Sequence, residues 1–66
     1  MKPHAIMADL KEIREANKIT QEVIGDEAGY NRVSIAFFET GRRDPKLSTV
    51  SNMAQVLGYE LVLRRR

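Results

Sequence analysis

The sequence predicts an all-α fold of four short helices, followed by one short C-terminal β-strand. In four segments apolar residues recur at the spacing of a helix surface, and glycine, asparagine or proline separates these segments. The stretch 21–41 is typical of two short helices with a glycine-containing turn between them. After Gly58 the apolar residues alternate with a period of two, which indicates a strand.

A first helix is predicted from about Ile6 to Asn17. Ile6, Leu10 and Ile13 recur at i, i+4 and i+7, so we expect them to face the core. Asn17 and Lys18 end this helix, because asparagine tolerates the left-handed backbone conformation.

The second and third helices are predicted at 21–28 and 31–40. Thr20 and Asn31 can cap them, since each side-chain oxygen can accept a hydrogen bond from a free N–H group of the first turn. Gly29 lies in the turn between the helices, where a residue that adopts positive φ is favoured. Together these elements predict a helix-turn-helix, a motif whose second helix enters the major groove in DNA-binding proteins.

The second helix is expected to turn Val23 or Ile24, together with Ala28, toward the core. Gly25 lies in its middle, where glycine costs about 0.5–1 kcal/mol relative to alanine. We expect close approach of another helix to explain it, and drift at a tolerant position is the alternative.

The third helix has two different faces. Ile35 and Phe38 are expected to face the core, with Ser34 as a small packing residue. The other face carries Arg32, Val33, Ala36 and Phe37. An exposed Val–Phe pair four residues apart is unusual unless something covers it.

The fourth helix is predicted from about Leu47 or Ser48 to Leu57. It follows the loop 41–46, in which Pro45 disfavours helical backbone at the residue before it. Its expected apolar face consists of Leu47, Val50, Met53, Ala54 and Leu57.

The segment 59–66 is predicted to be a strand with a basic end. Its residues Tyr59, Leu61 and Leu63 alternate with Glu60, Val62 and Arg64. A lone strand leaves its backbone groups unpaired, so it needs a partner. The simplest partner is the same segment of a second copy, paired antiparallel about a two-fold axis. A last helical turn followed by a frayed tail is the alternative.

Composition limits the classes of function. The 66 residues allow one domain, which we expect to span 1–66, and the absence of cysteine excludes disulfides and thiolate-metal sites. The one histidine, His4, can build neither a metal site nor a catalytic triad, so we expect no cofactor and no enzymatic activity. No apolar run reaches the length of a membrane span and no signal peptide is evident, so we expect a soluble, cytoplasmic protein.

The charges are segregated along the chain. Residues 1–29 contain four cationic and six anionic residues, a net charge of −2, whereas residues 30–66 contain seven and three, a net charge of +4. The basic half includes the third helix, which indicates a polyanionic partner.

Residues 10–58 resemble the lambda-repressor/Cro-like helix-turn-helix family, also called the xenobiotic-response-element family of bacterial and phage regulators. The most specific matches are ITQEVIG at 19–25, the Ser-Ile…Phe-Glu-Thr-Gly end of the third helix, and RDPKLSTV…AQVLG at 43–58. The resemblance implies a lambda-repressor-like bundle of four helices and a double-stranded DNA partner.

The resemblance also implies an internal ion pair. Arg14 and Glu39 match the arginine and glutamate with which the family connects the first helix to the end of the third. The alternative is that both side chains are solvated and independent. Gln21 matches the glutamine at the start of the second helix that hydrogen-bonds a phosphate.

For DNA recognition the resemblance implies two groups of residues. The residues expected at bases or nearby phosphates are Asn31, Arg32, Val33, Ala36 and Phe37, and those expected to clamp phosphates are Arg42, Arg43 and Lys46. The family prefers polar residues at positions 36 and 37, so packing of Phe37 within the protein is the alternative for that residue.

The family's usual fifth helix has no counterpart in this sequence. The segment after Gly58 is similar instead to the C-terminal strand of some antitoxin-type members, where the strand helps to form the dimer. We therefore expect Tyr59, Leu61, Val62 and Leu63 to lie at a dimer contact.

The sequence thus predicts a sequence-specific DNA-binding regulator that binds a palindromic operator as a homodimer and represses by occluding a promoter. The alternative is an antitoxin or accessory module that contacts a toxin or another protein, with or without DNA binding.

Overall fold

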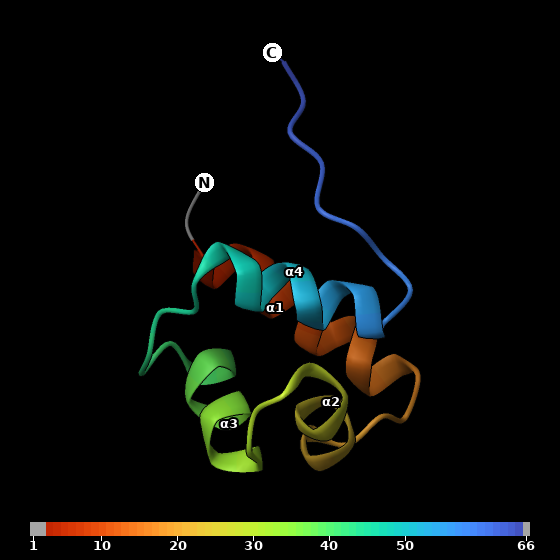
Figure 1. Ribbon diagram of the computed structural model, residues 1–66, viewed down its shortest axis with the longest axis vertical. Helices are drawn as coiled ribbons and strands as arrows, with labels where there is room; N and C mark the ends of the chain where they lie inside the picture. Colours follow the sequence, from red (N-terminus) through yellow and green to blue (C-terminus); the bar gives the residue numbers. More distant parts are fainter. Residues whose placement is uncertain (1–2, 66) are drawn as a thin grey trace.

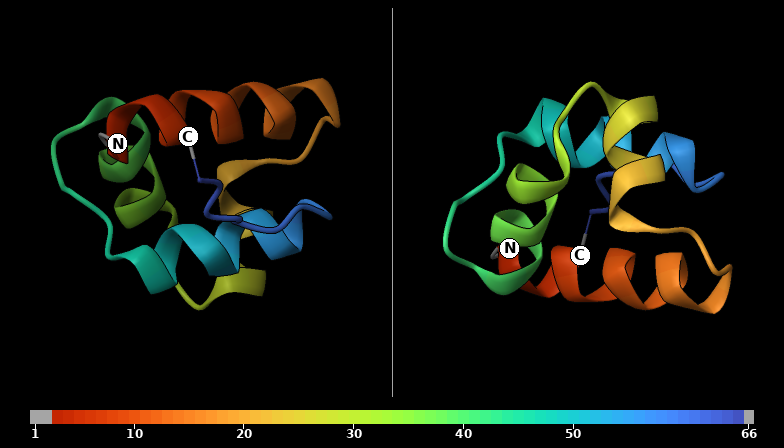
Figure 2. Two further views of the ribbon diagram at one scale, coloured as in Figure 1. Left: turned by 90° about the horizontal axis from the view of Figure 1, so that it is seen from above. Right: turned by 90° about the horizontal axis from the view of Figure 1, so that it is seen from below.

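The computed structural model describes residues 3–65, which form four helices and no strand. The helices are α1 (Pro3–Ala16), α2 (Gln21–Ala28), α3 (Arg32–Thr40) and α4 (Leu47–Val56). In Figure 1, α4 lies in front of α1 in the upper part of the molecule, and α2 and α3 lie beneath them. Both views in Figure 2 place α1 along one edge of the molecule and α4 along the other. The prediction of an all-α fold with four helices is confirmed.

The boundaries of α2 and α3 agree with the sequence prediction because local caps determine them. The Thr20 side chain accepts a hydrogen bond from the backbone N–H of Val23, and the Asn31 side chain accepts one from Ser34. Gly29 follows α2 with φ +87°, and its N–H donates to the Gly25 carbonyl. The start of α1 differs from the prediction: it begins at Pro3, and proline suits the first position of a helix because no hydrogen bond is needed from its nitrogen there.

All four helices contribute to one hydrophobic core. Its buried members are Met7, Leu10, Ile24, Ile35, Phe38, Val50, Met53 and Ala54. The core joins α1 and α4 to α2 and α3, since α1 packs against α3 and α4 packs against α2.

The predicted inner face of α1 is partly correct, because Leu10 is buried and Ile6 packs against the core, but the helix is rotated from the expected orientation. The inner row is Met7, Leu10 and Arg14, whereas Ile6 and Ile13 are only partly buried. The predicted row and the observed row share Leu10 and both have helical spacing. The spacing of apolar residues alone therefore does not show which row faces inward. The rotation that buries Arg14 is favoured because this side chain has a partner inside the protein, described below.

In α4 the predicted apolar face is correct at its centre and wrong at its start. Val50, Met53 and Ala54 are buried, but Leu47 is 73% exposed. Leu47 is the first residue of α4, at the end of the helix farthest from its buried central turns. In α2, Ile24 is buried and Val23 is exposed, which decides between the two residues expected at the core.

A hydrogen bond between two polar side chains supports the packing of α4. The hydroxyl groups of Tyr30 and Thr49 are 2.7 Å apart, and Thr49 is buried. The Tyr30 ring also meets Phe38 edge-on, with ring centroids 5.6 Å apart. The turn between α2 and α3 is therefore attached to both α3 and α4.

Gly25 is required by close approach, but the nearest obstacle is the turn after α2, and the other helix that was expected, α3, comes second. A Cβ atom at this position would overlap the carbonyl oxygen of Tyr30 and would lie 3.3 Å from Cγ1 of Ile35. The obstacles are the backbone of the following turn and a core side chain of α3, so neither can move away without disturbing the packing of α2 on α3.

Residues 59–65 leave the body of the molecule as an extended segment (Figure 1). They form no strand within the described chain, and they do not form the alternative helical turn either. The backbone N–H of Tyr59 donates to the Ala54 carbonyl, and Leu61 packs partly on the core. A strand requires a second extended segment beside it, and residues 3–58 provide none. Arg66 lies outside the described residues.

None of the helices within residues 3–65 is both long enough and apolar enough to span a membrane.

We predict that Gly25→Ala lowers the free energy of unfolding by about 1–3 kcal/mol, because the added methyl group overlaps the Tyr30 carbonyl and crowds Ile35 of α3. Urea denaturation followed by far-UV circular dichroism measures this loss. The matched control is Asp26→Ala, an exposed position of the same helix, which should change stability by less than about 0.5 kcal/mol. A Gly25→Ala variant as stable as this control would contradict the close approach.

Candidate nucleic-acid interface

A buried ion pair connects α1 to the end of α3. Nε of Arg14 donates to Oε2 of Glu39 at 2.7 Å, and Nη2 of Arg14 donates to Oε1 at 3.0 Å. The two side chains are only 8% and 1% exposed. This bidentate geometry matches the planar guanidinium to the carboxylate, and burial weakens the screening of the pair by salt. The remaining Nη1 group donates to the carbonyl oxygen of Ile19 at 2.7 Å, which attaches the α1–α2 loop to the same pair.

Gln21 joins this network from the first residue of α2. Its Nε2 donates to Oε1 of Glu39 at 2.9 Å, so the Glu39 carboxylate accepts three hydrogen bonds. A carboxylate can only accept, so the amide nitrogen of Gln21 must face it. An amide nitrogen carries two N–H groups, and the second remains able to donate to an anion outside the protein.

The outer face of α3 presents the residues that the sequence analysis assigned to bases. Arg32 and Val33 are exposed, and Ala36 and Phe37 are partly buried. Asn31 is exposed before the first turn, where its oxygen accepts from the Ser34 N–H at 2.7 Å. Its oxygen is therefore engaged in the cap, and its amide nitrogen is the group with which it can contact a ligand.

Two arginines from the following loop lie against Phe37. The guanidinium carbons of Arg42 and Arg43 are 5.8 and 5.4 Å from the centroid of this ring. A cation is attracted to the face of an aromatic ring, so Phe37 holds both positive charges beside the C-terminal end of α3. This contact covers Phe37 in part, while Val33 stays exposed.

Arg43 is also held by two hydrogen bonds to α3. Its backbone N–H donates to the Phe37 carbonyl at 3.2 Å, and its Nη1 donates to Oγ of Ser34 at 3.2 Å. The sequence analysis treated Ser34 only as a small packing residue and missed this role. A serine and an arginine nine positions apart share no local pattern, so only the path of the loop reveals the contact.

The surface of α3 and the loop after it carries four exposed cations and one exposed anion, Asp44. Its exposed cations are Arg32, Arg42, Arg43 and Lys46. Lys46 precedes α4 without capping it through its side chain. Within residues 3–65 no three His, Cys, Asp or Glu side chains gather where a metal ion could bind. Donor groups of this kind, displayed on a short exposed helix, suit phosphate oxygens and base edges.

Comparisons with known proteins agree with this geometry. A family model described as helix-turn-helix matches residues 10–63. A protein of Bacillus subtilis (strain 168), named "Uncharacterized HTH-type transcriptional regulator YqaE", is 32% identical over 53 residues. That alignment covers 80% of this chain and 46% of the relative, so the chain spans about half the length of the curated relative.

We predict that Arg14→Met and Glu39→Leu, made singly, each lower the free energy of unfolding by about 3–5 kcal/mol, because each leaves a buried charge without its partner. The double variant should recover part of this loss, since an apolar pair of similar volume leaves no charge unpaired. Urea denaturation of the four proteins measures the coupling. Single variants that lose less than about 1 kcal/mol would mean that the two side chains act independently.

Proposed function

The chain belongs to the Cro/C1-type helix-turn-helix family of DNA-binding regulators, a non-enzymatic family, and we propose that it binds a palindromic operator as a homodimer and represses the promoter that contains it. The observation that carries the proposal is the exposed face of α3, bordered by arginines that the protein itself holds in place. The Bacillus subtilis relative is named a transcriptional regulator, which supports a regulatory role.

In this proposal α3 lies in the major groove. Arg32, in the first turn, can donate a bidentate pair of hydrogen bonds to O6 and N7 of guanine. Val33 can cover the methyl group of a thymine, and the amide nitrogen of Asn31 can donate to a base or a nearby phosphate. Ala36 and Phe37 lie farther along the same face, where their apolar surface suits thymine methyl groups as well.

The phosphate contacts of the proposal lie on both sides of α3. Gln21 offers its second amide N–H from the start of α2. On the other side, Arg42, Arg43 and Lys46 carry the charges that neutralise phosphates. Arg42 and Arg43 rest on Phe37, so less side-chain freedom is lost when they bind.

A homodimer suits this helix because one α3 contacts only a few base pairs. Two copies related by a two-fold axis would place their α3 helices about 34–36 Å apart, one turn of DNA, and would bind a palindrome. Occupation of a promoter by such a dimer is sufficient to repress it, and this mechanism requires only the single DNA-binding domain proposed for residues 1–66. A DNA partner is consistent with a location in the cytoplasm, at the nucleoid.

Selection of bound duplexes from a random DNA pool tests the proposal. It should be made at about 150 mM salt, where non-specific phosphate binding is weakened. We predict enrichment of a palindrome with half-sites about one helical turn apart. Retention that falls with salt, without enrichment of any sequence, would reject a DNA-reading homodimer and favour a module that acts through a partner protein.

Two arginine substitutions test the division between base and phosphate contacts. We predict that Arg32→Ala lowers discrimination at one base pair by about 1–3 kcal/mol, whereas Arg43→Ala weakens all sequences alike and reduces the salt dependence by about one phosphate contact. Titration of the selected site and its single-base variants at several salt concentrations measures both effects. Arg43→Lys, which keeps the charge, is the matched control and should retain the salt dependence. If both alanine variants lost affinity equally for all sequences, the division between a base contact at Arg32 and a phosphate contact at Arg43 would be contradicted.

A further inference from the structure

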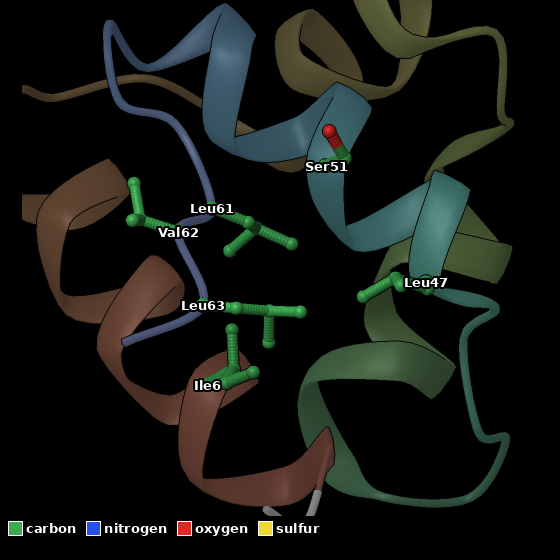
Figure 3. A pocket seen from close by; sticks show the side chains of 6 residues that line it. All are labelled: Ile6, Leu47, Ser51, Leu61, Val62 and Leu63. Carbon is green, nitrogen blue, oxygen red and sulfur yellow. The ribbon is translucent and has the colours of Figure 1, made fainter. Parts of the chain in front are cut away.

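Exposed apolar side chains lie on two separate parts of the molecule. One is a groove of about 260 Å³ between α1, α4 and the extended C-terminal segment, lined in part by Leu61 and Leu63 (Figure 3). No residue of α3, which the structure describes in full, lines this groove. The other is the outer face of α3, where Val33 is 47% exposed next to Arg32. Val33 therefore belongs to the surface that also carries the cations proposed to bind DNA.

The residues of this surface that are expected at bases offer hydrogen-bond donors and apolar groups. The guanidinium of Arg32 has five N–H groups and no acceptor. The side-chain oxygen of Asn31 accepts from the Ser34 N–H at 2.7 Å, so the amide nitrogen is the group that it presents. The remaining side chains are hydrocarbon, without donor or acceptor: Val33, Ala36 and Phe37. Among these five residues, all of them described, none presents an uncommitted side-chain acceptor.

Other side-chain oxygens on α3 are engaged inside the protein. Oγ of Ser34 accepts from Nη1 of Arg43 at 3.2 Å, and the Thr40 hydroxyl donates at 2.9 Å to a carbonyl of its own helix. The Glu39 carboxylate is buried and accepts three hydrogen bonds. Asp44, an exposed carboxylate, lies in the loop beyond the end of α3. The face itself is therefore restricted to donating and to apolar contact.

A face of this kind recognises only some of the groups in the major groove. The amino groups of adenine and cytosine are donors and need an acceptor, which these residues do not present. Guanine O6 and N7 are acceptors and suit Arg32. The 5-methyl group of thymine requires only an apolar neighbour, and Val33 supplies one. Carbon 5 of a pyrimidine is thus a position that this surface can distinguish.

Val33 is suited to contact a methyl group because its side chain is rigid. A valine in a helix strongly prefers one χ1 rotamer, so its two methyl groups are in place before binding. Ala36 and Phe37, three and four residues later, lie on the same side of α3. Phe37 is partly covered by Arg42 and Arg43, which leaves Val33 as the exposed large apolar side chain of this face.

We propose that α3 recognises the 5-methyl group of a pyrimidine through Val33, so that 5-methylcytosine can replace thymine in the operator. The two bases share the methyl group on carbon 5 and differ at position 4, where thymine has an acceptor and 5-methylcytosine has a donor. Because the face presents no acceptor and contacts carbon 5, it accepts both bases and rejects cytosine and uracil, which lack the methyl group. The inference rests on the proposed DNA binding and names the chemical group that is recognised.

Base analogues in the selected operator test the proposal. Each thymine of one half-site is replaced in turn by uracil, cytosine or 5-methylcytosine, the last two opposite guanine. Uracil keeps every hydrogen-bonding group of thymine and lacks only the methyl group, so it should weaken binding about fourfold at the position that meets Val33. At that position 5-methylcytosine should bind within about twofold of thymine, and cytosine at least as weakly as uracil. Fluorescence anisotropy titration measures these affinities.

Two valine substitutions test whether the effect belongs to α3. Val33→Ala should bind the thymine and uracil operators almost equally, because the variant has lost the contact with the methyl group. Val23→Ala is the matched control: Val23 is 48% exposed but lies on α2, outside the base-facing surface, so the preference for thymine should remain. Alanine suits an exposed helix position, so circular dichroism should show folded helices in both variants.

Three results would overturn the inference: uracil that binds as well as thymine at every position, 5-methylcytosine that binds as weakly as cytosine where uracil is weak, or a preference for thymine that the two valine variants keep or lose together. Failure of the proposed function looks different, since the random pool then yields no enriched sequence and both proposals are rejected. An enriched palindrome that binds equally well without the 5-methyl groups keeps the proposed function and rejects this inference.

Discussion

The carboxylate of Glu39 is the point at which three helices of this small protein meet. It belongs to α3, it forms a buried ion pair with Arg14 of α1, and it accepts a hydrogen bond from Gln21 of α2. A buried charge is tolerated only when it is paired and hydrogen-bonded, so the three helices are confined to the arrangement that satisfies this group. The guanidinium also binds the Ile19 carbonyl, which includes the α1–α2 loop in the same constraint. The orientation of α3 relative to the rest of the fold follows from it.

The outer surface of α3 depends on that orientation. Its inner face is occupied by Ile35 and Phe38 in the core, so the residues between them in the helical repeat must face outward. The loop after α3 then returns along the helix, where Ser34 and Phe37 hold Arg43. The surface that we propose for DNA is therefore preorganised by contacts inside the protein, and binding would require little further ordering of its side chains.

The size of the chain explains why an apolar surface remains elsewhere. A domain of this length buries only about 60% of the surface of its unfolded chain. Its core is one cluster of buried side chains from the four helices, and Leu47, Val62 and Leu63 remain exposed. Beside these side chains, residues 60–65 are extended and make no backbone hydrogen bond within the described chain.

The sequence by itself determined the elements that depend on neighbours along the chain. The caps at Thr20 and Asn31 and the turn at Gly29 act within a few residues, so the bounds of α2 and α3 were predictable, and the family resemblance paired Arg14 with Glu39. Only the tertiary structure decided which of two equally periodic rows of α1 faces inward, because the choice depends on Glu39, 25 residues after Arg14 in the chain. The tertiary structure also decided that Leu47 is exposed. It likewise brought Ser34 to Arg43 and Tyr30 to Thr49. These features depend on contacts between segments that are distant in the sequence. Neither the apolar periodicity nor a local motif predicts such contacts.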